Sequence, residues 1–223
     1  MIGVSGGVVD GQEVKVVSAR SKPTWRSYCH SIGDRSSLFA AVADGWGVRS
    51  ALYLGSYLDL APSTAIASVT YVDIDKRAAA FFADREVLES ELEGRRRPGA
   101  GEWIEFVHQD YTDPVPLQEG SFDLMVSLFT SPAWDSCRRY LAPDGLLLAN
   151  ASHGEASLAA LDSSLRLAAA IHHEDDTFHF DTKDLDSYLI PKNANHASAE
   201  RIRRDGKGVK YTRDAFAYLF LRV

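Results

Sequence analysis

Five short apolar runs along the middle of the chain constrain its fold more than any other feature. They are residues 51–54 (ALYL), 69–72 (VTYV), 103–107 (WIEFV), 122–128 (FDLMVSL) and 146–149 (LLLA). Aliphatic, aromatic and β-branched residues in runs of this length predict buried strands. Because segments with helical composition separate several of the runs, we expect the strands to pair in parallel through right-handed crossovers. Such a sheet carries helices on both faces.

The segments between the runs predict the helices. Residues 75–93 (DKRAAAFFADREVLESELE) predict one helix, which the glycine-rich stretch 94–101 ends. Shorter helices are expected after Asp34, near Pro62, over residues 133–141 and over residues 157–165. Residues 167–173 predict a sixth strand and residues 215–223 (AFAYLFLRV) a late strand, with a polar, irregular stretch at 174–212 between them.

Charge and cysteine content narrow the class of partner. The formal net charge of −7 repels a polyphosphate backbone, so a small-molecule substrate is favoured over a nucleic acid. The two cysteines, Cys29 and Cys137, suggest neither a disulfide framework nor a multi-cysteine metal site, and a reducing, cytoplasmic setting is expected. No apolar stretch is long enough to cross a membrane.

The residues that end the first three runs are Gly55, Asp73 and Asp110. Ligands of parallel α/β sheets bind beyond the carboxyl ends of the strands, so these residues are expected at one site. Asp73 is placed to accept hydrogen bonds from a ribose diol, and Asp110 from an adenine amino group. Ile74 and Tyr111 could pack on the faces of the base. The competing interpretation is that both carboxylates only cap the helices that follow.

The order of the segments YLGS, YVDID, FVHQD, FDLMVSL and YLAPDGLLLAN resembles the class I S-adenosylmethionine-dependent methyltransferases over about residues 50–152. The resemblance implies S-adenosylmethionine as cofactor. It places Gly55, Ser56 and Tyr57 at the methionine part, Asp73 at the ribose, Asp110 at the adenine and Ser127 near the transferred methyl group. The first turn departs from the family because Gly55 is its only glycine. We therefore expect the Ser56 hydroxyl or the Tyr57 ring to make contacts that backbone amides make elsewhere.

With this resemblance the predicted fold is an α/β, doubly wound, mostly parallel seven-stranded sheet with helices on both faces and an antiparallel C-terminal strand. Residues 1–223 are expected to form a single methyltransferase-like domain. Within it we predict an N-terminal helical segment or lid (1–50), a cofactor-binding core (51–152) and a C-terminal, substrate-side portion (153–223).

Methyl transfer from a sulfonium requires mainly alignment of the nucleophile and exclusion of water, so a general base is optional. The candidates for a catalytic role are His153, Asp135 and, if the N-terminal segment covers the site, Tyr28. The competing interpretations are a polar loop residue for His153 and a helix-start residue for Asp135. No metal site is predicted, because the adjacent His172 and His173 would point to opposite faces of a strand. Ser127, Thr130, Asn150 and His30 are further candidates around the same site.

The sequence leaves several functions open. The leading prediction is methylation of a small molecule, with an undetermined oligomeric state and a homodimer as one possibility. A methyltransferase-like enzyme could instead use the sulfonium differently, by intramolecular displacement or aminocarboxypropyl transfer. A nicotinamide-dependent oxidoreductase would need a glycine fingerprint that the segment GSYLDL lacks. A nonenzymatic binding module is the remaining alternative.

Overall fold

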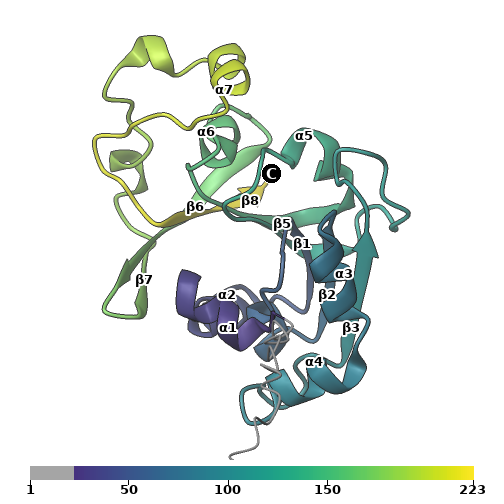
Figure 1. The fold of residues 1–223 in the computed structure, drawn as a ribbon. Coiled ribbons are helices and arrows are strands. Elements are labelled where there is room, and N and C mark those ends of the chain that lie inside the picture. Colours follow the sequence, from purple (N-terminus) through teal and green to yellow (C-terminus); the bar gives the residue numbers. More distant parts are fainter. Residues whose placement is uncertain (1–22) are drawn as a thin grey trace, which may run out of the picture.

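One eight-stranded sheet runs through residues 23–223, the part of the chain that the computed structural model describes (Figure 1). Its strands lie in the order β3 (Trp103–His108), β2 (Ser68–Asp73), β1 (Ser50–Leu54), β4 (Phe122–Ser127), β5 (Leu141–Ala149), β8 (Ala217–Arg222), β6 (Leu165–Glu174) and β7 (Thr177–Asp181). The pairs from β3 to β5 are parallel, while β8 is antiparallel to both β5 and β6. The predicted α/β sheet and the antiparallel C-terminal strand are therefore confirmed.

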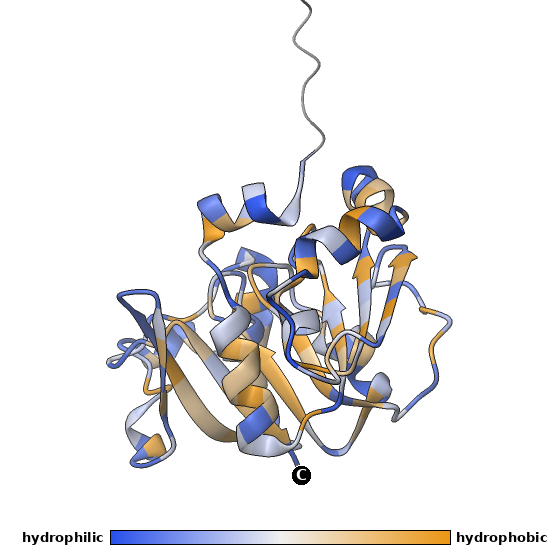
Figure 2. Cartoon of the chain, turned by 90° about the horizontal axis from the view of Figure 1, so that it is seen from below, coloured by the Kyte–Doolittle hydropathy of each residue, from blue (hydrophilic) through white to orange (hydrophobic). Residues whose placement is uncertain are grey.

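Helices cover both faces because β1, β2 and β4 bury side chains on both sides. The described helices are α1 (Trp25–Ile32), α2 (Ser36–Trp46), η1 (Ala61–Thr64), α3 (Lys76–Phe82), α4 (Arg85–Leu92), α5 (Trp134–Cys137), η2 (Arg138–Tyr140), α6 (Glu155–Ala159), η3 (Leu185–Ser187), η4 (Ala194–His196) and α7 (Ala199–Asp205). Hydrophobic residues concentrate in the strands and along α2 (Figure 2). Successive residues of a strand point to opposite faces, so each face acquires its own apolar layer.

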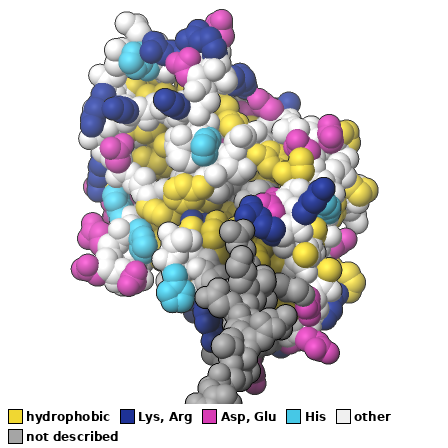
Figure 3. All heavy atoms as spheres, viewed as in Figure 1, with side chains coloured by type: hydrophobic (Ala, Val, Ile, Leu, Met, Phe, Trp, Pro, Cys, Tyr) yellow, Lys and Arg dark blue, Asp and Glu magenta, His cyan; other side chains and the backbone are white. Residues whose placement is uncertain are grey.

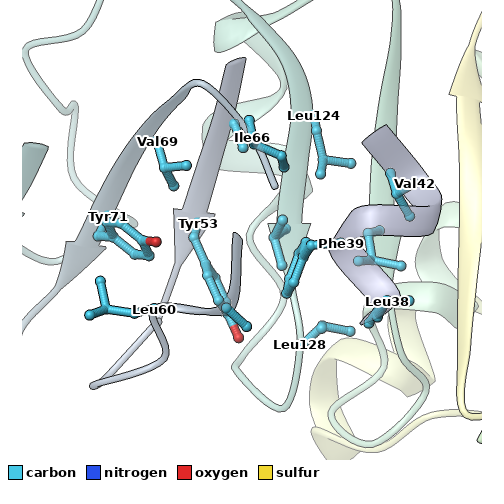
Figure 4. Packing of buried hydrophobic residues seen from close by; sticks show 14 of the residues in the cluster. Leu38, Phe39, Val42, Tyr53, Leu60, Ile66, Val69, Tyr71, Leu124 and Leu128 are labelled. Carbon is cyan, nitrogen blue, oxygen red and sulfur yellow. The ribbon is translucent and has the colours of Figure 1, made fainter. Parts of the chain in front are cut away.

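The two layers contain different helices. On one face α2, α3 and α4 pack against strand residues such as Tyr53 and Tyr71. Figure 4 shows this layer, with Leu38, Phe39 and Val42 of α2 beside the strands. On the other face α5 and α6 pack against Leu52 and Leu54 of β1 and against the middle of β5. The helix positions thus follow the alternation of side chains along the central strands.

The sheet has eight strands, and the prediction of seven was wrong because β7 lies in the stretch expected to be irregular. Phe178 and Phe180 alternate with polar residues along β7 and are half-buried, which is the two-residue period of a strand. Asp175 and Asp176, which link β6 to β7, both have positive φ (46° and 59°), as in a two-residue hairpin turn. Because two acidic residues form this turn, the hairpin of β6 and β7 was not predicted from the sequence.

The predicted helix over residues 75–93 is two helices. The Asp84 side chain accepts a hydrogen bond from the Val87 N–H and begins α4, while α3 ends at Phe82. A short polar side chain that caps the backbone competes with continuation of a helix. The helices predicted over 133–141 and 157–165 are also shorter, since α5 gives way to η2 and α6 ends at Ala159.

Residues 143–145 form a bulge inside β5, where Asp144 has a φ of 58° and the register with β4 shifts.

The N-terminal segment is anchored to the helices beside it. Trp25 of α1 is fully buried beneath the Arg95 guanidinium, which lies 3.7 Å from its ring centroid. The Arg26 N–H also donates to Glu91 Oε2 of α4 at 2.8 Å. Residues 1–22 of the predicted lid lie outside the described residues, and the division of the chain into three portions stays a prediction. No helix within residues 23–223 has the length and apolar character to span a membrane.

Candidate active site

A pocket of about 310 Å³ lies where the carboxyl ends of β1 to β4 meet, and we call it the strand-end pocket. It is lined by Gly55, Asp73, Ile74, Gln109, Asp110, Tyr111, Thr112, Phe129, Thr130 and Ser131. This edge is where open parallel sheets bind their ligands, and the volume lies at the lower end of the range for ligand pockets. Five of the eight predicted cofactor residues line it: Gly55, Asp73, Ile74, Asp110 and Tyr111.

Asp73 is held rigidly in the wall of the strand-end pocket. Its carboxylate is 8% exposed, and its two oxygens accept hydrogen bonds from the backbone N–H groups of Tyr57 and Asp75, each at 2.7 Å. A carboxylate can accept about four hydrogen bonds, so two acceptor positions remain after these contacts. Asp73 both ties the turn after β1 to β2 and keeps capacity for a ligand donor.

Asp110 lies on the same pocket and is ordered by its own turn. Its Oδ1 accepts the Thr112 N–H at 2.9 Å and the Thr112 hydroxyl at 2.7 Å. These two hydrogen bonds hold the pKa of the Asp110 carboxyl below its ordinary value. Asp110 therefore stays ionised at neutral pH. Among the described residues no helix follows Asp110 before β4, so its contacts with Thr112 order a turn and do not cap a helix, and they leave Oδ2 outside both contacts.

Gly55 permits a close approach within the protein. Its φ is 65°, and a Cβ at this position would lie 2.4 Å from Thr130 Oγ1. The Thr130 hydroxyl in turn lies 2.8 Å from the Tyr111 hydroxyl, which donates to the Ser131 carbonyl oxygen at 3.1 Å. The single glycine therefore lets the loop after β4 close against the turn after β1.

Ser56 and Tyr57, also predicted to contact the cofactor, do not line the strand-end pocket. The Ser56 side chain is 1% exposed, and its hydroxyl has no hydrogen-bond partner among the described residues. The Tyr57 ring lies between Tyr28 and the Arg77 guanidinium, at 5.0 Å from each. Because the Tyr57 N–H donates to Asp73, the turn folds back on β2 and carries both side chains out of the pocket.

Ser127 lies behind the pocket, in contact with a buried carboxylate. Its hydroxyl donates to Glu155 Oε2 at 2.9 Å. Glu155 is 1% exposed and also accepts the backbone N–H groups of Ala133 and Trp134. Burial raises the pKa of Glu155 above its ordinary value. Glu155 thus fixes both ends of the loop that carries Phe129. The sequence analysis missed this buried carboxylate, although a lone acidic residue at the start of an apolar helix could have indicated it.

The three predicted catalytic residues are not brought together. His153 is exposed in the loop after β5, and Asp135 forms an exposed ion pair with Arg203 at 2.6 Å. Neither residue lines the strand-end pocket. Tyr28 is half-buried against Tyr57, and burial raises the pKa of its hydroxyl. Of the three, Tyr28 alone contacts a residue of the turn after β1.

A buried ion pair beside the pocket was missed in the sequence. Arg35 and Asp59 are 5% and 1% exposed, and Arg35 Nη1 lies 3.2 Å from Asp59 Oδ2. The Tyr53 hydroxyl donates to the same carboxylate oxygen at 3.1 Å. The Arg35 guanidinium also lies 5.0 Å from the centroid of the Phe129 ring. The pair joins the start of α2 to the turn after β1. The charged Asp59 within the apolar segment YLDLA could have indicated a buried ion pair in the sequence.

The histidines of the stretch 171–181 serve the C-terminal hairpin. His172 Nε2 lies 2.7 Å from the Tyr188 hydroxyl, which donates to Asp181. In residues 23–223, no group of three or more His, Cys, Asp and Glu side chains is arranged to hold a metal ion.

The mostly parallel α/β sheet and the strand-end pocket are those of an open α/β protein with a pocket at its strand ends, and comparisons with known proteins point to one family. Residues 52–149 match the family model described as "Methyltransferase domain". The match covers less than half of the chain, and it agrees with the predicted resemblance to class I methyltransferases and with S-adenosylmethionine as the predicted cofactor. No curated protein matches the chain.

Several solved structures are similar in fold. N-methyltransferase NodS from Bradyrhizobium japonicum, in complex with S-adenosylhomocysteine, is 16% identical, with 71% of this chain and 88% of that chain covered and a TM-score of 0.48. A Corynebacterium glutamicum protein is 15% identical (65% and 81% covered, TM-score 0.45). A Pyrococcus horikoshii protein is 13% identical (89% and 92% covered, TM-score 0.45).

Proposed function

We propose that the protein transfers the methyl group of S-adenosylmethionine to a small molecule, with the adenosyl part of the cofactor in the strand-end pocket. One observation carries the proposal: Asp73 and Asp110 line the same pocket, together with Ile74 and Tyr111. Two carboxylates beside apolar side chains match the donors and the flat faces of an adenosine. These residues therefore fit the cofactor that the family uses.

Each residue has a role in this proposal. Asp73 accepts hydrogen bonds from the ribose hydroxyls, and the Tyr57 and Asp75 N–H groups keep its carboxylate oriented. Asp110 accepts a hydrogen bond from the adenine amino group, while Ile74, which is 66% exposed without a ligand, packs on the base. When bound, the cofactor supplies an electrophilic methyl group on a sulfonium. The protein contributes alignment of the acceptor and exclusion of water.

A small-molecule acceptor is supported by the net charge of −7, which disfavours a nucleic-acid partner. Cys29 and Cys137 are both free thiols, in keeping with the proposed reducing compartment.

A second candidate is a different use of the same sulfonium, by displacement at another carbon. The observation that favours it is the turn after β1, where the Tyr57 N–H is engaged by Asp73 and is not free for the methionine part of the cofactor. The nicotinamide-dependent alternative has no such support.

Mass spectrometry of the purified protein for a carried adenosyl compound tests cofactor binding first. A product assay with labelled S-adenosylmethionine then separates the candidates. Release of S-adenosylhomocysteine supports methyl transfer, whereas release of methylthioadenosine supports displacement at another carbon. Absence of any adenosyl ligand, together with no heat on titration with S-adenosylhomocysteine, would contradict both.

A further inference from the structure

A second pocket, of about 500 Å³, adjoins the strand-end pocket, and we call it the C-terminal pocket. It is formed by the loop after β5 (residues 150–152), the loop at residues 207–210 and the start of β8 with the residues before it. Phe129 lines both pockets. A molecule in the C-terminal pocket would therefore lie next to a ligand at the strand ends.

Contacts of Gly208 and Val209 fix the loop at residues 207–210 in place. A Cβ on Gly208 would lie 1.9 Å from the Ala151 carbonyl oxygen, so only glycine allows this approach. The Val209 N–H donates to Ser157 Oγ at 2.9 Å, and the Val209 side chain is buried. The two lysines that flank this anchor, Lys207 and Lys210, are thus carried by a rigid part of the wall.

These lysines differ from the arginines around them. The arginines of α7 and Arg213 form ion pairs with Asp135, Asp181 and Asp205. Lys and Arg side chains gather around α7 at the top of the molecule (Figure 3). In contrast, Lys207 and Lys210 are exposed and form no ion pair within residues 23–223. Asp214 also lines the pocket. The charged side chains of the pocket are therefore Lys207, Lys210 and Asp214, with a net charge of +1.

The remaining wall is aromatic. The rings of Phe129 and Phe216 lie 5.9 Å apart, and Tyr218 lines the pocket behind them. Phe129 is 48% exposed, although a side chain of this size is ordinarily buried. Its ring is available to a flat or apolar ligand. A pocket with an apolar wall and a few charged groups is the usual form of a small-molecule site.

We infer that the C-terminal pocket binds the acceptor and that the acceptor is a small carboxylic acid with an apolar or aromatic body. Lys207 and Lys210 bind its carboxylate, and Phe129 and Phe216 pack against its body. This inference rests on the proposed function, which needs an acceptor beside the cofactor. A nucleic acid is disfavoured because the nearby arginines are already paired and the protein is acidic.

The test measures binding of a probe acid to the full chain saturated with S-adenosylhomocysteine. The probes are phenylacetate and its neutral counterpart phenylacetamide, titrated by ligand-observed NMR at low salt. The variant Lys207→Gln/Lys210→Gln removes both pocket charges. The matched control Lys183→Gln/Lys192→Gln removes two exposed lysines outside the pocket and changes the net charge equally.

We expect phenylacetate to bind the wild type and the control with equal affinity, and the pocket variant at least about tenfold more weakly. Phenylacetamide should bind all three proteins alike. Equal phenylacetate affinity in the pocket variant and the wild type would overturn the inference, as would displacement of phenylacetate by a single-stranded oligonucleotide that binds more tightly. Binding of S-adenosylhomocysteine is measured separately on the same samples. If S-adenosylhomocysteine binds and phenylacetate does not, this inference fails; if S-adenosylhomocysteine does not bind, the proposed function fails.

Discussion

Asp73 joins the fold to the candidate site through one carboxylate. Its oxygens hold the backbone of Tyr57 and Asp75, and it lines the strand-end pocket. We predict that Asp73→Asn weakens binding of S-adenosylhomocysteine by about 1–3 kcal/mol, because the amide replaces one acceptor with a donor. Isothermal titration calorimetry measures the change. Asp113→Asn, an exposed site outside the pocket, is the control, and equal dissociation constants for both variants would remove Asp73 from the binding site.

Glu155 should make stability depend on pH. Burial raises its pKa, so the folded state holds the proton more tightly than the unfolded state. The stabilisation this confers is complete below the unfolded pKa and is lost as pH rises through the folded pKa. We predict that Glu155→Gln lowers the free energy of unfolding by about 1–3 kcal/mol at low pH, because the amide NH2, unlike the hydroxyl of a protonated carboxyl, cannot accept a hydrogen bond from any of the three donors.

Urea unfolding from about pH 4 to about pH 7 tests this, since the cost of the substitution should shrink as pH rises. The exposed Glu93→Gln is the control for general charge effects. A cost for Glu155→Gln that grows with pH would show that the folded state prefers the ionised carboxylate.

Removing one partner of the Arg35–Asp59 pair should lower the free energy of unfolding strongly, whereas replacing both partners with apolar residues should lower it little. Arg35→Met leaves a carboxylate that is 1% exposed without its cation, so we predict a loss of about 3–5 kcal/mol in the free energy of unfolding. The double variant Arg35→Met/Asp59→Leu should recover most of that loss because it removes both charges. Denaturant unfolding measures both variants, and additive losses in the double variant would argue against direct coupling.

At the scale of elements, the contact between the turn after β1 and the loop after β4 depends on Gly55. Gly55→Ala would place a methyl group against Thr130 in a left-handed backbone conformation. We predict a loss of stability above about 1–2 kcal/mol, together with weaker binding of S-adenosylhomocysteine. Gly45→Ala, in α2 with no atom near the added methyl group, should instead stabilise by about 0.5–1 kcal/mol. Thermal unfolding separates the two, and equal midpoints would refute the packing role of Gly55.

The central elements were predictable because their signals are local. The runs that form β1, β2 and β4 are nearly continuous apolar segments, as strands buried on both faces require. The hairpin of β6 and β7 was not predicted, because the acidic turn Asp175-Asp176 and the polar face of β7 mask its alternation. Asp84 likewise divides α3 from α4 by a side-chain cap that lies within an otherwise helical pattern.

At the scale of the whole molecule, position along the strands predicted which residues share an edge but not which way each side chain turns. Asp73 and Asp110 follow their strands into one pocket. Tyr57 does not, because its backbone is drawn to Asp73 and its ring packs between Tyr28 and Arg77. The Arg35–Asp59 pair and the Phe129 ring beside it depend on contacts between distant segments, which no local pattern specifies.

A crystal structure of the protein with S-adenosylhomocysteine tests the central claim most directly. We predict the ribose hydroxyls within hydrogen-bond distance of the Asp73 carboxylate, and the adenine ring between Ile74 and Tyr111 with its amino group at Asp110. An adenosyl group bound elsewhere, or one in the strand-end pocket with neither carboxylate in contact, would contradict it.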